Sequence, residues 1–128
     1  MGETPADPGK SGAERRRSPR FEALDKLLGI LVSYDLPVRI RDVGFGGFSV
    51  ETVEPLTAGA RGPVRFMSPD NWTTELTAQS LYCRPSIAAD GTPRYVTGFQ
   101  FINEQAADVR SRISELIAKV TSVRVFEA

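Results

Sequence analysis

The sequence predicts a mainly β domain, a six-stranded antiparallel β-barrel with one C-terminal α-helix. Short runs in which apolar and polar residues alternate recur along residues 37–102. Clusters of Gly, Pro, Asn and Asp separate these runs, and several short strands divided by such turns are typical of small barrels. Closure of the sheet would also spare the chain exposed edges. An apolar stripe with helical spacing follows the last run and indicates the helix.

The clearest strand begins at Pro37, where Val38 and Ile40 alternate with arginines, and a similar alternation follows at 48–51. Asp90-Gly91 is a typical hairpin turn. Segment 21–33 also fits a helical face, but its end has strand composition, and a strand is favoured there. The further strands are therefore expected at 21–33, 64–67, 72–84 and 94–102.

The helix is expected to begin after Asn103, a residue type that often caps helix N-termini. Its apolar residues recur at three- and four-residue intervals and form one stripe, whereas its charged residues lie off that stripe. Such a stripe usually covers the domain's own core, and this interpretation is preferred to a membrane or partner helix. The stripe consists of Val109, Ile113, Leu116, Ile117 and Val120.

Composition limits the classes of function. A chain of 128 residues, with 41% hydrophobic and 25% charged residues, has the size of one domain. It contains no histidine, which excludes Ser-His-Asp and Cys-His catalysis and imidazole metal sites. The single cysteine, Cys83, excludes an intramolecular disulfide and fits a reducing cytoplasm. No apolar run is long enough to span a bilayer. We therefore expect a cytoplasmic protein that is not an enzyme and has no metal, cofactor or membrane insertion.

Charge is distributed unevenly. Sixteen basic and sixteen acidic residues cancel, so no overall field argues for nucleic acid as a partner. Between Glu14 and Arg20, however, four arginines face one glutamate. We expect a disordered lead at 1–13, a flexible arginine-rich arm at 14–20, the barrel and helix at 21–122, and a tail at 123–128. The arm is a candidate anion site.

The second chemically distinctive stretch lies between two predicted strands. Asp42 is followed by Gly44, Gly46 and Gly47. Glycines allow another group to approach the backbone closely, and Asp42 supplies a hydrogen-bond acceptor beside that opening. Taken alone, such a stretch is usually a turn or a bulge.

Together the two stretches resemble the signature of the PilZ domain family. One part of that signature is two adjacent arginines and a third that is separated from the second by three residues, which Arg15, Arg16 and Arg20 match. The other part is Asp or Asn, any residue, Ser, two residues of any kind, and Gly. Asp42 and Gly47 match it. The resemblance extends from Arg15 to about residue 120 and implies a six-stranded barrel with a C-terminal helix.

The resemblance also implies a ligand, the bacterial second messenger cyclic di-GMP. By this likeness Arg16 and Arg20 would hold phosphate and guanine, with assistance from Arg15. A guanidinium suits both, since it forks onto phosphate oxygens or the guanine edge and stacks on bases. Asp42 would accept hydrogen bonds from guanine N1 and N2 or brace an arginine, and Gly47 would permit close approach. No cofactor is implied besides this ligand.

Gly44 departs from the pattern, because the family has serine there. Loss of one neutral hydrogen bond costs roughly 0.5–1.5 kcal/mol, or up to about 3 kcal/mol if a buried partner is left unpaired. Charge-assisted contacts from arginine are each worth about 1.5–3 kcal/mol. We therefore expect affinity for cyclic di-GMP to be reduced but retained, and Gly44→Ser to raise it.

Two functions remain open at this stage. The first is a cyclic di-GMP receptor whose arm becomes ordered on ligand binding and which signals through an unidentified protein partner. The second is a degenerate PilZ domain that does not bind the nucleotide and acts as a protein-protein interaction module. Gly44 favours the second function, and the intact arginines favour the first.

Overall fold

The computed structural model describes residues 19–122 and residue 126. The expected lead at 1–13, most of the arm, including Arg15 and Arg16, and most of the tail at 123–128 lie outside the described residues. The described elements follow one another in chain order as seven strands, a short 3-10 turn at Val32–Tyr34 and one helix. They are β1 Phe21–Glu22, β2 Leu28–Leu31, β3 Leu36–Val43, β4 Gly47–Thr52, β5 Arg61–Met67, β6 Thr73–Ile87, β7 Pro93–Phe101 and α2 Ala107–Thr121.

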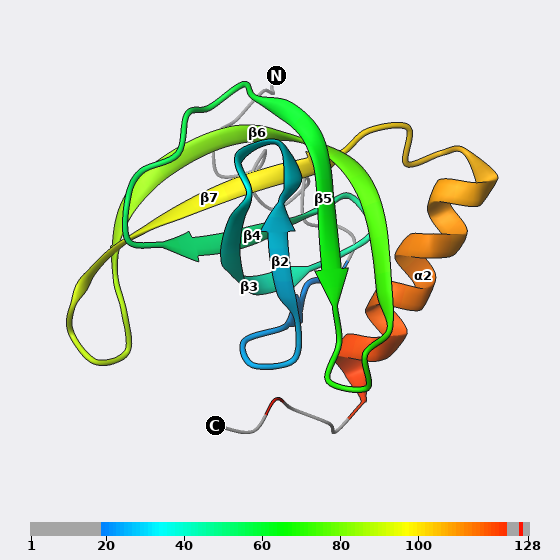
Figure 1. Cartoon of the computed structure of the whole chain (residues 1–128), viewed down its shortest axis with the longest axis horizontal. Coiled ribbons are helices and arrows are strands. Elements are labelled where there is room, and N and C mark those ends of the chain that lie inside the picture. The colour runs from blue at the N-terminus through cyan, green and yellow to red at the C-terminus, as the bar shows by residue number, and fades with distance from the viewer. Residues whose placement is uncertain (1–18, 123–125, 127–128) are drawn as a thin grey trace, which may run out of the picture.

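The sheet closes into the expected six-stranded antiparallel barrel. Its order is β3-β2-β5-β6-β7-β4, and β4 pairs again with β3 to complete the ring. The two-residue strand β1 lies outside the ring and pairs with β3. In Figure 1, α2 lies beside β6 at one side of the barrel, and the β6–β7 hairpin extends from the opposite side.

Aromatic rings fill the barrel interior. Phe48 stacks on Phe99 with a centroid distance of 4.8 Å and meets Phe66 edge-on at 5.0 Å. The helix closes this core as the stripe predicts, since Ile113, Leu116, Ile117 and Val120 are all buried and Val109 is partly buried against the cluster. The alternation in the strands and the stripe on the helix have the same cause: apolar side chains are removed from water on the side that faces the core, and polar side chains remain on the other side.

Two local expectations were wrong. Segment 21–33 is not one strand: a turn separates β1 from β2, with Asp25 in the left-handed region at φ 66°. Burial of Ala23 and Leu27 stabilises this turn, and its backbone closes through the Leu27 N–H, which donates to the Ala23 carbonyl at 3.1 Å. The last residues of that segment form the 3-10 turn.

The helix begins at Ala107, not directly after Asn103. Asn103 adopts a left-handed conformation at φ 60°, which asparagine tolerates better than most residues. Its carbonyl accepts a hydrogen bond from the Ala106 N–H at 2.9 Å, so it belongs to the turn that precedes the helix. The hairpin at Asp90-Gly91 is confirmed, with Gly91 at φ 86°.

Candidate functional site

The glycine-rich stretch forms the tight connection between β3 and β4. The Gly44 N–H donates to the Gly47 carbonyl at 2.8 Å and closes the turn. The Gly46 carbonyl accepts from the Phe101 N–H at 3.0 Å, which ties the turn to the end of β7. Asp42 therefore stands at the end of β3 on a rigid part of the barrel.

Strand β1 carries the last arginine of the arm to this turn. Phe21 pairs with Val43, and Glu22 pairs with Asp42. Arg20 precedes β1 directly, and its Nη1 donates to Asp42 Oδ1 at 2.7 Å although the residues are 22 positions apart. The structure thus brings together two of the site residues that the sequence predicts, one from each motif. The pair lies at the surface, with 37% of the Arg20 side chain and 34% of the Asp42 side chain exposed.

The three glycines have different surroundings. A Cβ on Gly44 would lie 2.7 Å from the Pro19 carbonyl oxygen and 3.0 Å from Arg20 Cδ. A Cβ on Gly47 would overlap the Phe99 carbonyl oxygen, whereas a Cβ on Gly46 would meet nothing within 4 Å. The absence of a side chain at Gly44 therefore lets the base of the arm lie against the turn, and its absence at Gly47 lets strand β7 lie close to β4.

The position of Pro19 and Arg20 bears on the expected effect of Gly44→Ser. A serine at this position would force the base of the arm to shift, because a carbonyl oxygen at 2.7 Å leaves no room for a Cβ. The gain of a hydroxyl is therefore opposed by a steric cost that the sequence did not reveal. Gly44 is matched to the observed arrangement of the arm.

A row of four residues crosses the outer face of the sheet at this level. Asp42 pairs with Ser49, Ser49 pairs with Gly98, and Gly98 pairs with Tyr82. Directly opposed residues of antiparallel strands lie on the same face. We call these residues the outer row: Asp42 on β3, Ser49 on β4, Gly98 on β7 and Tyr82 on β6.

Tyr82 is a candidate site residue that sequence reasoning missed. Its ring lies over Gly98 so closely that a Cβ there would overlap it, and the residue is still 40% exposed. The guanidinium of Arg84 lies 5.5 Å from the ring centroid. An aromatic residue beside a strand glycine is a recurrent packing device. That signal needs the pairing of Tyr82 with Gly98, which the sequence alone did not provide.

The sequence matches the PilZ domain family over residues 14–119. This chain belongs to the PilZ domain family. None of the curated proteins matches the sequence. The matched range includes both motifs and therefore both Arg20 and Asp42.

Several solved structures share this fold. The PilZ domain of YcgR from Escherichia coli, solved with c-di-GMP, has a TM-score of 0.65 at 20% identity over 83% of this chain and 91% of that chain. MrkH from K. pneumonia, in complex with c-di-GMP, has a TM-score of 0.63 at 21% identity over 81% of this chain and 51% of that chain. The Bacillus subtilis inhibitor of motility MotI/DgrA has a TM-score of 0.52 at 15% identity over 86% of this chain and 53% of that chain. This PilZ domain spans about half the length of the MrkH and MotI chains.

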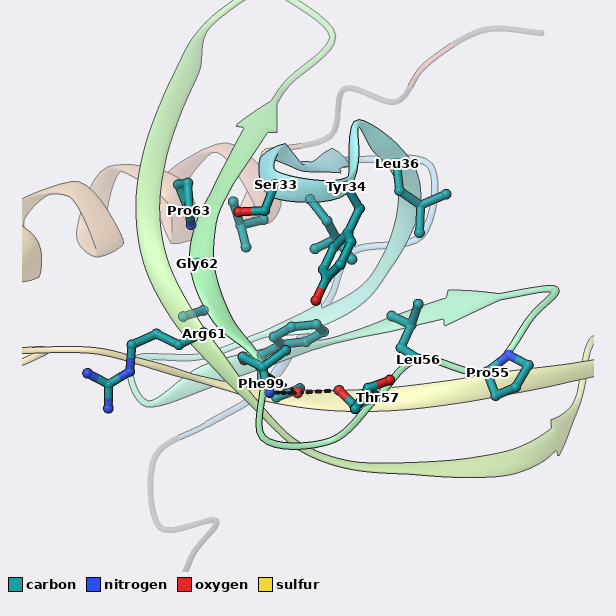
Figure 2. A pocket seen from close by; sticks show the side chains of 15 residues that line it. Ser33, Tyr34, Leu36, Pro55, Leu56, Thr57, Arg61, Gly62, Pro63 and Phe99 are labelled. Carbon is teal, nitrogen blue, oxygen red and sulfur yellow. Dashed lines mark hydrogen bonds between the residues drawn. The ribbon is translucent and has the colours of Figure 1, made fainter.

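The concave pockets of this PilZ domain lie away from the two motifs. A cavity of about 310 Å³ lies between the 3-10 turn, β5 and the loop before β5, and none of its lining residues belongs to either motif. Figure 2 shows Tyr34 pointing from the turn into this cavity, toward Leu56 and Phe99. A second depression of about 540 Å³ is also lined by residues outside the motifs. The Arg20–Asp42 pair lies outside both pockets, and each of its side chains is partly exposed.

Helix α2 contacts the motif turn as well as the core. The Arg110 guanidinium lies 5.0 Å from the ring centroid of Phe45, a partly buried residue of the turn.

No helix among the described residues is long and apolar enough to cross a membrane. In the same part of the chain, no three side chains of Cys, Asp or Glu gather as a metal site would require.

Proposed function

We propose that this PilZ domain is a receptor for cyclic di-GMP that catalyses no reaction and passes ligand binding on to a protein partner. The observation that carries the proposal is the 2.7 Å contact between Arg20 and Asp42. It places the described end of the arginine motif against the carboxylate of the second motif. One small surface thus holds a guanidinium, which is suited to phosphate, and a carboxylate, which is suited to the edge of guanine.

The two groups complement different parts of the ligand. A guanidinium forks onto phosphate oxygens or onto guanine O6 and N7. A carboxylate accepts the N1 and N2 hydrogens on the opposite edge of guanine. In the proposed complex Arg20 and Arg16 hold phosphate and guanine, Arg15 assists, and Asp42 accepts from guanine. Gly47 keeps β7 close to the turn and the surface beside Asp42 open.

An exchange of partners would make the surface responsive to ligand. An exposed ion pair such as Arg20–Asp42 is worth about 0–1 kcal/mol. A charge-assisted contact to a phosphate is worth about 1.5–3 kcal/mol. Arg20 can therefore leave Asp42 for the ligand at small cost, and the rest of the arm then closes over it. The ordered arm would form the altered surface that a protein partner recognises.

Tyr82 would contribute a stacking platform. Its ring is exposed on the outer row that begins at Asp42. Stacking of a base on an aromatic ring is worth about 1–3 kcal/mol. A purine bound by Asp42 through its edge would lie within the same row.

The related structures support the ligand class. YcgR and MrkH were each solved with c-di-GMP, and both share this fold. MrkH is described as a transcription regulatory factor, so our expectation that nucleic acid is not a partner of this chain stays a prediction. The cytoplasmic location also stays a prediction.

Titration calorimetry with cyclic di-GMP tests the proposal, with GTP, which carries the same base, titrated alongside for comparison. Wild type should bind saturably, and Arg16→Ala/Arg20→Ala should lose binding while its circular dichroism is unchanged. Arg17→Ala is the matched control, because Arg17 adjoins the motif without belonging to it, and it should bind like wild type. No heat from wild type at about 100 micromolar ligand, where a Kd of that size still gives about half occupancy, would contradict the proposal.

The observation at Gly44 favours a second candidate, a degenerate PilZ domain that binds a protein constitutively. Pro19 and Arg20 at the base of the arm pack on Gly44, where the family has serine, so these two residues already contact the barrel without ligand. In this case a protein partner would bind equally well with and without cyclic di-GMP. Partner affinity that changes with the nucleotide would exclude this second function.

A further inference from the structure

We infer that Ser49 supplies the ligand-binding hydroxyl that this chain lacks at Gly44. The inference deepens the proposed function and rests on it. In the family motif the hydroxyl comes from a serine two residues after the aspartate, on the turn. Here that position is glycine, and a hydroxyl is carried instead by Ser49 on β4, which is the Cα partner of Asp42.

The position of Ser49 fits this role. Its Cα partner is Asp42, and directly opposed residues share a face of the sheet. On its other side Ser49 pairs with Gly98, which has no side chain to compete for the space. The hydroxyl therefore lies between the carboxylate of Asp42 and the platform formed by Gly98 and Tyr82.

The hydroxyl of Ser49 has no use within the described fold. Ser49 is 5% exposed, and its Oγ is buried without a hydrogen-bond partner in the described part of the chain. A buried polar group that makes no hydrogen bond weakens folding, and such groups are uncommon. Thr97 Oγ1 shares this property, but Thr97 lies opposite the buried Val50, on the core face of β7. Ser49 is therefore the unpaired hydroxyl on the face that carries Asp42.

The chemistry of guanine gives the hydroxyl a partner. Asp42 accepts the N1 and N2 hydrogens, and O6 is the acceptor next to N1 on the same edge of the base. A hydroxyl beside the carboxylate donates to that oxygen, so the pair reads all three groups of the edge. Adenine carries an amino group in place of O6 and would leave Ser49 without an acceptor. Because Ser49 is only 5% exposed in the structure, the contact requires the side chains around it to move when the ligand binds.

Ser49→Ala tests the inference, with Ser86→Ala as the matched control. Ser86 lies on another strand, β6, and its replacement likewise removes one hydroxyl, but Ser86 is two residues beyond Arg84 and outside the outer row. By calorimetry Ser49→Ala should bind cyclic di-GMP roughly threefold to tenfold more weakly, the worth of one neutral hydrogen bond. Its Tm should equal or exceed that of wild type, since the deleted hydroxyl has no partner in the fold. Ser86→Ala should leave both values unchanged.

Ser49→Cys provides a second variant, because it keeps the shape of the side chain and replaces the hydroxyl by a weak donor. It should weaken binding to a similar extent. Equal affinity of Ser49→Ala and wild type would overturn the inference and leave the receptor function intact. A Tm that falls together with affinity would also overturn it, in favour of a packing role. Failure of wild type itself to bind would overturn both proposals.

Discussion

The inner and outer faces of the same strands differ in the kind of side chain that they carry. On the inner face of β4 and β7, Phe48 and Phe99 stack at 4.8 Å with an interplanar angle of 2°. On the outer face, Ser49 is buried without a partner, and Tyr82 is exposed above Gly98. The two faces alternate along the chain, one residue at a time.

We expect the inner face to determine the stability of the domain and the outer row to determine ligand binding. The inner face carries the buried apolar side chains of the core, so its residues contribute most of the favourable free energy of folding. The outer row contributes little to folding and leaves hydrogen-bonding groups available. Inner substitutions should therefore change stability first, and outer substitutions should change ligand binding first.

The largest effect should come from Phe48→Ala. Phe48 is fully buried and contacts Phe66, Phe99 and Phe101. Truncation of a buried phenylalanine costs about 3–5 kcal/mol, a large part of the stability of a domain of this size. Urea denaturation followed by circular dichroism measures this loss. A loss below about 1 kcal/mol would show that the stacked rings are not the centre of the core.

The outer face is tested by Asp42→Asn. Ligand affinity should fall roughly tenfold to hundredfold, because a charge-assisted acceptor worth about 1.5–3 kcal/mol becomes neutral. The free energy of unfolding should change by less than about 1 kcal/mol, as for other exposed ion pairs. Calorimetry and urea denaturation on the same preparation give both values.

Asp70→Asn is the matched control for this change. Asp70 Oδ2 accepts a hydrogen bond from Lys119 Nζ at 2.7 Å, the same distance as in the Arg20–Asp42 pair. Their exposures are also similar, with 32% for Lys119 and 36% for Asp70. Asp70 lies in the β5–β6 turn and outside the outer row, so its replacement should leave ligand affinity unchanged. An equal loss of affinity in both variants would remove Asp42 from the site.

Much of the fold could be predicted from local patterns. Alternation around Val38–Arg41 and 48–51, the Asp90-Gly91 hairpin and the helical stripe are each visible within a few residues, and all were confirmed. The turn between β1 and β2 was not predicted, because Ala23 and Leu27 adopt it in order to become buried under other elements. Tertiary packing therefore determined the conformation of segment 21–33, whose local sequence fitted both a helix and a strand.

The candidate site divides in the same way. Arg20 and Asp42 could be named because a sequence motif carries them, and the structure places them together. Tyr82 could not, because the β6–β7 pairing shifts register between Ser80 and Tyr82. Strict alternation from the buried Ser80 would place Tyr82 inside the barrel, and the bulge turns it to the outer face. Ser49 was missed since its importance depends on which residues lie beside it in β3 and β7.

Substitutions of two glycines in the turn test which of them the fold requires. Gly47→Ala should destabilise the domain by about 1–3 kcal/mol, because its Cβ would overlap the Phe99 carbonyl and β7 would have to move. Gly46→Ala has open space and should stay within about 0.5 kcal/mol of wild type. Thermal unfolding of the two variants side by side gives the comparison. Equal stability would mean that β4 and β7 can separate at this level without cost.

The smallest expected effect concerns pH and the ion pair between Lys119 and Asp70. Hydrogen bonds from Lys119 and then from Ser68 hold the pKa of Asp70 well below its usual value of 3.8. A lowered pKa in the folded state means that the ionised carboxylate stabilises the fold above the unfolded pKa and that this contribution is lost as pH falls. Wild type should therefore exceed Asp70→Asn in Tm at pH 6, and the difference should shrink progressively below about pH 4. The other carboxylates are common to wild type and Asp70→Asn, so their titration does not contribute to the difference in Tm between the two proteins. A gap in Tm that stays constant down to pH 2 would show that Asp70 acts through the geometry of the β5–β6 turn rather than through its charge.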